Sequence, residues 1–308
     1  MVLTTPLFNA LKKLYAPLHL TVIATEKAAI IPSTHRAVDE VIPLPPGVLR
    51  QIPSLTSHLR SKRFDLYIDI KDHRSTTSRL IAELVRADRV ITHRSNIGPL
   101  LNTRKRGHLL PPAADPGHYV DKALAPLALL APGEKFNRMP ALTIPREAFM
   151  EVDDQLNPGM YGLIAINISA GDRSRYWMPE KWKEVIARLA KRYSIAVLSS
   201  PEDRALADEI CTTRREARPV RTGSILEAAA VIERSLVVIS PDTSIIHVAS
   251  ALDKPCIGLY PASDSNARTF APLSSRHRVI MPPEGKEFGA IEVEKVLEGV
   301  KEMQNSKL

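Results

Sequence analysis

The stretch SPDTSIIHVASALDKPCIGLYP, residues 240 to 261, decides the fold of this chain. A β-branched run ends at Ile239, so we expect a strand to stop there and a Ser-Pro-Asp-Thr-Ser turn to follow it. A helix is expected to begin near Ile245, and a second apolar strand is expected at residues 256 to 260. A strand, a helix and a strand in this order predict a parallel β-α-β unit.

The junction between this first strand and its helix is a candidate anion site. The N–H groups of a helix's first turn have no partners inside the helix, and the helix dipole is positive there. Thr243 and Ser244 add hydroxyl donors after Asp242, and His247 is expected on the first turn of the helix. The alternative is that Asp242 or Thr243 only caps the helix.

A second expected strand end carries basic residues. The segment NISAGDRSRYWMPEKW, residues 167 to 182, contains the end of an apolar run, a loop and the start of a helix. Small residues from Ser169 onward permit close approach of the backbone, while Arg173 and Arg175 offer guanidinium groups to phosphate. Two basic residues at a strand end suit a diphosphate ligand.

The tryptophans and cysteines carry weaker signals. Trp177 and Trp182 could stack on a base or a sugar, but packing beneath the loop is favoured for Trp182, and Trp177 is left open. Cys211 and Cys256 show neither CxxC nor Cys/His spacing, so they predict no zinc site and no disulfide framework. Both thiols are interpreted as small packed residues.

Both halves of the chain alternate short apolar runs with amphipathic stretches. Expected strands in the first half lie at 18–24, 38–44, 64–70 and 90–92, and those in the second half lie at 163–168, 195–199, 236–239 and 256–260. The proline-rich stretch 102–145 is interpreted as loops, a short helix and a crossover. We therefore predict an α/β fold with two Rossmann-like, doubly wound parallel sheets, over residues 1–145 and 155–308, with ligands at the carboxyl ends of the strands.

Composition and charge narrow the class of protein. The 308 residues are 44% hydrophobic and 25% charged, which is typical of globular chains. The formal net charge of +8 favours an anionic partner, but aromatics at 5% argue against a nucleic-acid-binding protein. No apolar run reaches the roughly 18 to 20 residues of a membrane-spanning helix, and no secretory signal is evident. We expect a cytoplasmic protein.

Three spaced motifs together resemble a known enzyme family. They are S-x-G-x-x-x-R-x-W-x-P-E at 169–180, T-G-S-I-L-E at 222–227 and D-T-S-x-x-H-x-A-S-A-L-x-K-P-x-I-G-L-Y at 242–260. Their order resembles the ADP-heptose:lipopolysaccharide heptosyltransferases of glycosyltransferase family 9. TTPLFNALKKLYAP at 4–17 is similar to that family's first helix, and FDLYIDIKDHRSTTSRLIAEL at 64–84 is similar to its acceptor-side strand and helix.

The resemblance implies a GT-B fold, with the acceptor on the N-terminal domain and the nucleotide sugar on the C-terminal one. Arg175 stands where the family has a lysine that contacts donor phosphate, and Ser244 replaces the glycine of a D-T-G-x-x-H signature. No D-x-D triplet occurs, so neither a metal nor a cofactor is expected. The implied donor-binding residues are Ser169, Arg175, Asp242, Thr243, Ser244 and His247.

The beginning of the chain departs from the family pattern. Family members begin with a strand and a Gly-Asp pair before the first helix, and the aspartate is the expected general base; the sequence MVLTTPLF has neither. Either the recorded start is internal to a longer natural protein, or the chain is a shortened paralogue. Asp69 and Asp72 are candidate substitute bases, although a carboxylate at a strand end often only caps or faces solvent. The catalytic residue is therefore left open.

The predicted acceptor-binding residues lie in a basic segment of the first half of the chain. Lys71 and Arg74, with His73 between them, could hold an anionic lipopolysaccharide core, and a solvated basic loop is the alternative. The end of the first helix, with Lys12, Lys13 and Tyr15, could touch the inner face of the inner membrane together with Leu7 and Leu11. The alternative is that the helix packs its apolar side on its own sheet.

The sequence thus predicts one function and leaves two alternatives. The prediction is metal-independent, inverting transfer of heptose from ADP-heptose to the inner core of lipopolysaccharide. The first alternative is a catalytically weak or silent nucleotide-sugar-binding paralogue. The second is a GT-B-type epimerase that acts on a nucleotide sugar without an acceptor.

Overall fold

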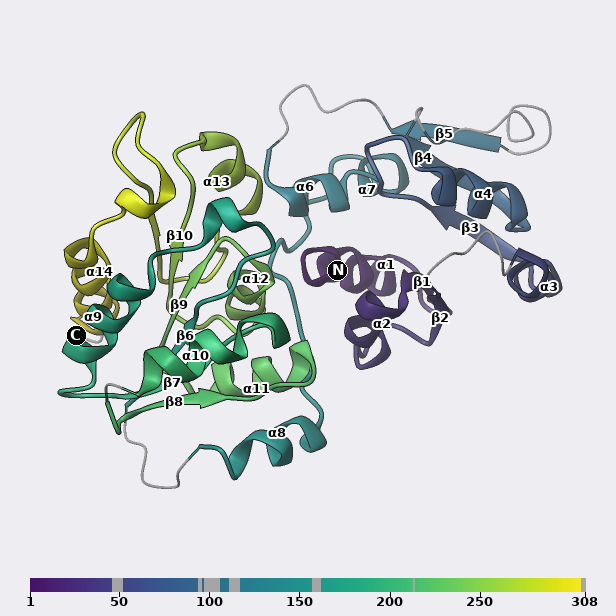
Figure 1. The fold of residues 1–308 in the computed structure, drawn as a ribbon. Coiled ribbons are helices and arrows are strands. Elements are labelled where there is room, and N and C mark those ends of the chain that lie inside the picture. The colour runs from purple at the N-terminus through teal and green to yellow at the C-terminus, as the bar shows by residue number, and fades with distance from the viewer. Residues whose placement is uncertain are drawn as a thin grey trace. The chain divides into compact units, whose positions relative to one another are not determined.

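The chain folds as two compact units. The computed structural model describes residues 1–45, 52–93, 96, 106–110, 117–156, 162–212 and 214–305. Unit 1 takes Met1, Leu3–Ser33 and Ala37–Arg138, and unit 2 takes Val2, Thr34–Arg36 and Met139–Leu308. Figure 1 draws unit 1 mainly in purple and blue and unit 2 in teal, green and yellow. The domain ranges inferred from the sequence, 1–145 and 155–308, remain predictions.

Unit 2 is built on one six-stranded sheet in which every neighbouring pair is parallel. The strand order is β11-β10-β9-β6-β7-β8, so the first strand of this unit lies in the middle of the sheet. Every residue of β6, β9 and β10 is buried, as expected for strands covered on both faces. The strands are β6 (Leu163–Asn167), β7 (Ser194–Leu198), β8 (Ala217–Val220), β9 (Val237–Pro241), β10 (Cys256–Leu259) and β11 (His277–Ile280).

Helices cover both faces of this sheet. In Figure 1, α9 and α14 lie on one face, and α11 and α12 lie on the other. The helices of unit 2 are α8 (Arg146–Asp153), η4 (Arg173–Arg175), α9 (Pro179–Leu189), η5 (Pro201–Asp203), α10 (Arg204–Cys211), α11 (Ile225–Arg234), α12 (Ser244–Ala251), α13 (Asp264–Phe270), η6 (Phe288–Ala290) and α14 (Val293–Asn305).

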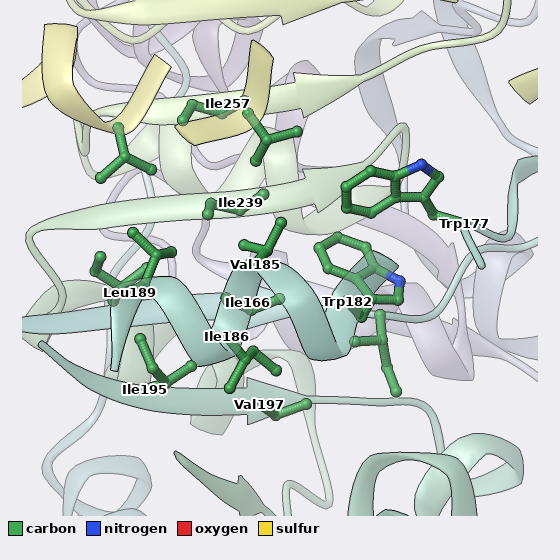
Figure 2. Close-up of a cluster of buried hydrophobic side chains, with 14 of the residues drawn as sticks. Ile166, Trp177, Trp182, Val185, Ile186, Leu189, Ile195, Val197, Ile239 and Ile257 are labelled. Carbon is green, nitrogen blue, oxygen red and sulfur yellow. The ribbon is translucent and has the colours of Figure 1, made fainter. Parts of the chain in front are cut away.

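The core of unit 2 shows why α9 forms where it does. Pro179 occupies the first turn of α9, where its missing N–H costs nothing. The buried residues of α9 recur at helical spacing and pack on β6, β9 and β10, as Figure 2 shows. These α9 residues are Trp182, Val185, Ile186 and Leu189.

Both tryptophans belong to this core. The rings of Trp177 and Trp182 meet edge to face with centroids 4.8 Å apart, and both side chains are buried. Trp177 also donates its indole N–H to the carbonyl of Ile291 at 3.2 Å. The packing interpretation of Trp182 is confirmed, and Trp177, which the sequence left open, is a core residue too.

Unit 1 contains two separate parallel sheets. One pairs β1 (Thr21–Thr25) with β2 (Glu40–Leu44), and the other has the order β3-β4-β5. The strands of the second sheet are β3 (Phe64–Ile68), β4 (Ala87–His93) and β5 (Arg106–Leu110). β5 corrects the interpretation of 102–145 as loops and one short helix, which its prolines and weak apolar pattern had suggested.

The helices of unit 1 pack their apolar sides on these sheets. They are η1 (Val2–Thr4), α1 (Thr5–Leu14), α2 (Glu26–Ser33), α3 (Ile52–Ser61), α4 (Thr76–Leu84), α6 (Tyr119–Leu124) and α7 (Leu127–Leu130). Leu7 and Leu11 of α1 are buried in a cluster with Leu127, so these two side chains pack inside unit 1, while membrane contact by the Lys12, Lys13 and Tyr15 end of α1 remains a prediction. In the described ranges, no helix is both long and apolar enough to cross a bilayer.

The two cysteines are packed side chains, as the sequence suggested. Cys211 and Cys256 are both free and buried. Burial raises the pKa of each thiol to about 12, so neither is an activated nucleophile at neutral pH.

Candidate functional site

A polar cavity opens at the carboxyl end of the unit 2 sheet. Its volume is about 680 Å³. Loops that follow β6, β9 and β10 build its wall together with the start of α12 and with α13. This is where ligands bind in doubly wound sheets. The lining residues are Gly171, Asp172, Ser174, Arg175, Asp242, Thr243, Ser244, His247, Pro261, Asn266 and Phe270.

The start of α12 combines a cap with a cavity wall. Thr243 is the N-cap residue in extended conformation, and its hydroxyl accepts the N–H of Ile245 at 3.3 Å. Thr243 therefore caps α12, as the alternative interpretation of the sequence held, and it also lines the cavity. Ser244 opens the helix, so the positive end of the helix dipole points toward this wall.

Asn167 joins the ends of two neighbouring strands. Its amide nitrogen donates to the carbonyl of Ser169 at 3.0 Å, to the hydroxyl of Ser240 at 2.9 Å and to that of Thr243 at 3.3 Å. The side chain is buried at the last position of β6. The sequence interpretation missed this role, although a polar residue that ends an apolar strand was a usable signal.

Arg175 and Asp242 form an ion pair inside the cavity. Arg175 Nη1 donates to the carbonyl of Asp242 at 2.8 Å and to its carboxylate at 3.0 Å. Asn266 Nδ2 donates to the same carboxylate oxygen at 3.2 Å. Burial raises the pKa of Asp242, and Arg175 and Asn266 act in the opposite direction. Asp242 thus orders the β9–α12 turn and fixes the guanidinium of Arg175 at the cavity wall.

Ser169 lies behind the cavity wall. Its hydroxyl accepts the N–H of Ser200 at 2.8 Å, and the side chain is buried. Ser169 is not among the residues that line the cavity. Its contribution is to join the loop after β6 to the loop after β7, and its predicted contact with a donor remains a prediction.

α13 supplies residues that the sequence interpretation did not anticipate. Asn266 reaches the Asp242 carboxylate, and Phe270 lies beside His247 with ring centroids 6.0 Å apart. No strong apolar period marks the stretch DSNARTF, so this helix was not predicted. Phe270 and His247 both line the cavity, so this ring pair adds an apolar surface beside its polar residues.

The acidic residue Asp172 lines the cavity, but its carboxylate is bound by its own loop and leaves the cavity suited to an anion. Asp172 is turned to its own loop, because Ser174 donates to it from N–H at 2.8 Å and from Oγ at 2.6 Å. These bonds lower the pKa of Asp172. Over the described ranges, no three His, Cys, Asp or Glu side chains are grouped to hold a metal ion.

In unit 1, the candidate base Asp69 already serves the local fold. Its carboxylate accepts the backbone N–H of Lys71 at 3.1 Å and the amide of Asn96 at 3.2 Å. Asn96 also donates to the carbonyl of Lys71 at 2.9 Å. Asp69 is buried, so these bonds fix the turn that follows β3.

The remaining acceptor-side residues are more exposed. Asp72 pairs with Lys122 at 2.9 Å, and this hydrogen bond lowers the pKa of the Asp72 carboxyl. The Lys71 ammonium reaches the hydroxyl of Ser75 at 3.4 Å, and Arg74 is exposed. The structure thus places Lys71 and Arg74 on one surface loop of unit 1, and their acceptor-binding role remains a prediction.

Comparison with known proteins identifies relatives of this chain. Residues 52–297 match the family described as glycosyltransferase family 9 (heptosyltransferase). The chain is 24% identical over 285 residues to lipopolysaccharide heptosyltransferase 3 of Escherichia coli (strain K12), covering 86% of this chain and 80% of that protein.

Solved structures show the same fold. A family 9 glycosyl transferase from Veillonella parvula has a TM-score of 0.85 at 19% identity, over 99% of this chain and 94% of that chain. ADP-heptose lps heptosyltransferase II of E. coli has a TM-score of 0.81 at 20% identity, over 100% and 96%. The predicted GT-B fold class is confirmed, and since the family match spans well over half of its length, this chain belongs to glycosyltransferase family 9, the heptosyltransferases.

Proposed function

We propose that this glycosyltransferase transfers heptose from ADP-heptose to the inner core of lipopolysaccharide, with inversion and without a metal ion. The names of its relatives support the donor and the acceptor, since the E. coli proteins include a lipopolysaccharide heptosyltransferase and an ADP-heptose lps heptosyltransferase. The net charge of +8 suits an anionic acceptor.

One observation carries the proposal. The N-terminus of α12, the ion-paired Arg175 and the hydroxyl of Ser244 line one cavity at the carboxyl end of the sheet. Backbone N–H groups, a helix dipole and a guanidinium are the groups that bind a nucleotide diphosphate and stabilise it as a leaving group. His247 and Asn266 are proposed to contact the sugar.

The acceptor side of the proposal rests on unit 1. Lys71 and Arg74 are proposed to bind phosphate or acidic sugars of the core, because both lie on an exposed basic loop at the end of β3. Since such an acceptor carries a lipid, we also propose that the protein works in the cytoplasm, at the inner face of the inner membrane.

The proposed donor site is tested by comparing the binding of ADP with that of adenosine, which lacks the two phosphates. Arg175→Ala should weaken ADP binding by about tenfold, which is the usual worth of a charge-assisted contact, and should leave adenosine binding nearly unchanged, as measured by titration calorimetry. Arg173→Ala is the matched control, because Arg173 stacks on Tyr176 at 4.9 Å and does not line the cavity. Equal ADP affinity in the two variants would remove Arg175 from the diphosphate site.

A binding protein without turnover is the second candidate function. Asp69 is engaged by Lys71 and Asn96, and Asp72 is engaged by Lys122, so neither carboxylate is poised as a general base. Loss of a general base costs roughly a hundredfold to ten-thousandfold in rate.

A transfer assay separates the candidates. Product formed from ADP-heptose and a purified inner-core acceptor supports the transferase. Donor binding without product supports the silent paralogue. Conversion of the donor in the absence of an acceptor would instead indicate the epimerase.

A further inference from the structure

Asp203 of unit 2 is a buried aspartate that does not cap the helix it precedes. It is the last residue of η5 and stands immediately before α10, where an aspartate usually accepts an N–H of the first helical turn. Within the described helix its side chain makes no such bond, and only 6% of the residue is exposed. A buried carboxylate is costly unless it is hydrogen-bonded, so the partners of Asp203 lie elsewhere.

These partners come from two loops at the carboxyl end of the sheet. Tyr176, on the loop after β6, donates its hydroxyl to Asp203 Oδ2 at 2.6 Å. Ser200, on the loop after β7, donates its hydroxyl to the same oxygen at 3.1 Å. Burial raises the pKa of this carboxyl, but hydrogen bonds from Ser169, Tyr176 and Ser200 outweigh it and leave the pKa below its ordinary value. The carboxylate is therefore ionised at neutral pH and accepts charge-assisted hydrogen bonds.

This network holds both ends of the segment that carries Arg175. At its beginning, the hydroxyl of Ser169 accepts the N–H of Ser200 at 2.8 Å. At its end, Tyr176 directly follows Arg175 in the chain and is bound by Asp203. Residues 171–174 between these two points are exposed. The backbone beneath Arg175 is therefore fixed against the loop after β7 by hydrogen bonds on either side of an exposed stretch.

We propose that Asp203 is a positioning residue of the donor site: by holding the hydroxyl of Tyr176, it fixes the loop after β6 so that the guanidinium of Arg175 meets the donor diphosphate. This inference rests on the proposed function, because it takes Arg175 as a ligand of that diphosphate.

The placement of Asp203 favours an action through Arg175 over a contact with the ligand in the polar cavity. Neither Asp203 nor Tyr176 is among the described residues that line this cavity, whereas Arg175 is. A long arginine side chain loses conformational freedom when it binds an anion, and this loss weakens binding. A fixed backbone below the guanidinium, together with its ion pair to Asp242, lowers that cost before the ligand arrives.

Two tyrosines of unit 2 allow a matched test. Tyr176→Phe removes the hydroxyl that Asp203 holds. Tyr193→Phe removes a hydroxyl that donates to Gln304, also at 2.6 Å, and Tyr193 precedes β7 at the amino end of the sheet, away from the cavity. Titration calorimetry should show that Tyr176→Phe weakens ADP binding about fivefold, the worth of one hydrogen bond. Tyr193→Phe should leave the ADP affinity unchanged, and equal affinities of the two variants would overturn the proposal.

A double-mutant cycle shows whether Asp203 acts through Arg175. In the Arg175→Ala background, Tyr176→Phe or Asp203→Ala should weaken ADP binding by less than about twofold further, because the group that they position is gone. The full fivefold loss in that background would overturn the positioning role. Adenosine binding should be unchanged in Tyr176→Phe and in Asp203→Ala. Equal losses of ADP and adenosine affinity would mean that Asp203 contacts the nucleoside or supports the whole unit, and would also overturn it.

Hydrogen exchange of the ligand-free protein tests the loop without reference to the donor. Tyr176→Phe should speed the exchange of the amides of residues 171–176 at least about threefold relative to Tyr193→Phe. Unchanged exchange in this segment would show that the Tyr176–Asp203 bond does not fix the loop, and would overturn the inference. A wild-type protein that binds no ADP would refute the donor site of the proposed function, and this inference with it. Wild-type binding that Tyr176→Phe leaves unaltered would overturn this inference alone.

Discussion

The two units repeat one architecture and differ at its centre. Unit 2 holds six parallel strands in a single sheet, with β6 fully buried between β9 and β7. Unit 1 has five described strands in two sheets, and residues of β1 and β3 line a cavity of about 1110 Å³. The comparison teaches that local patterns specify the strands and helices, while one central strand makes a sheet continuous.

The difference extends to the carboxyl end of each sheet. In unit 2, Asn167 at the end of the central strand donates to Ser240 and Thr243, and thereby joins two strand ends beside the polar cavity. In unit 1, the polar contacts after β3 are local, since Asp69 binds Lys71 and Asn96. A central strand thus contributes to the site as well as to the core.

Removing a large core side chain of unit 2 should have the largest effect. Trp182→Ala deletes a fully buried ring that packs on Trp177, so it should destabilise unit 2 by about 3–5 kcal/mol. Calorimetric scans should show the transition of unit 2 shifted while that of unit 1 keeps its temperature. Trp182→Phe is the control, and it should lower the stability of unit 2 by less than Trp182→Ala does. A loss below about 1 kcal/mol would mean that the core of unit 2 is looser than its burial indicates.

The buried carboxyl of Asp242, in the polar cavity, makes the stability of unit 2 depend on pH. Burial raises the pKa of Asp242 in the folded state, so its contribution to stability is present below the unfolded pKa and is lost as the pH rises through the folded pKa. Asp242→Asn should remove this dependence above about pH 4. Arg175→Ala should strengthen this dependence, because the buried carboxylate loses its cation. At neutral pH the variant should lose on the order of 2 kcal/mol of unfolding free energy relative to the wild type.

Urea unfolding of unit 2 between pH 4 and pH 7 measures these slopes. Identical pH profiles for the wild type and Asp242→Asn would show that the carboxyl titrates as it does in the unfolded chain.

Helix caps offer a smaller, matched comparison of the two units. Ser224 caps α11 of unit 2 by accepting the N–H of Glu227 at 3.3 Å, and Ser75 caps α4 of unit 1 by accepting that of Ser78 at 3.2 Å. Alanine at either position should cost about 1 kcal/mol. Each substitution should shift only the thermal transition of its own unit. A shift of both transitions by one substitution would show that the units unfold together.

The smallest expected effect concerns the surface of unit 1. Lys122 lowers the pKa of Asp72, so the pair adds stability above the unfolded pKa, and this is lost as the pH falls through the folded pKa. Lys122→Met should raise the pKa of the Asp72 carboxyl toward its ordinary value in an NMR titration, because the Lys122 hydrogen bond is the largest cause of its lowering. Because Asp72 is 41% exposed, the change in stability should stay below about 0.5 kcal/mol. An unchanged titration curve would mean that the pair does not form in solution.

In unit 2, the sequence predicted the central strands of the sheet better than its edge strands. β6, β9 and β10 are runs of apolar residues between turn signals, so periodicity and length identified them. The edge strands β8 and β11 read ARPV and HRVI, and their short, mixed patterns gave no signal. Both were missed for that reason.

The sequence motifs predicted several residues of the candidate site, but not the tertiary contacts that these residues make. Asp242, Thr243, Ser244 and His247 line the cavity, as their place after a strand suggested. Ser169 accepts the N–H of Ser200, a contact that depends on tertiary packing and that no local pattern encodes, and its predicted donor contact remains a prediction. Asn266 was not anticipated, since it depends on where α13 returns to the sheet.

Hydrogen exchange with and without ADP-heptose tests the donor cavity most directly. The account predicts that the ligand slows exchange in two segments of unit 2, residues 167–175 and 240–247, because these hold the loop after β6 and the start of α12. Arg175→Ala should reduce this protection at the same ligand concentration. Protection absent from both segments, with the donor demonstrably bound, would contradict the assignment of this cavity as the donor site.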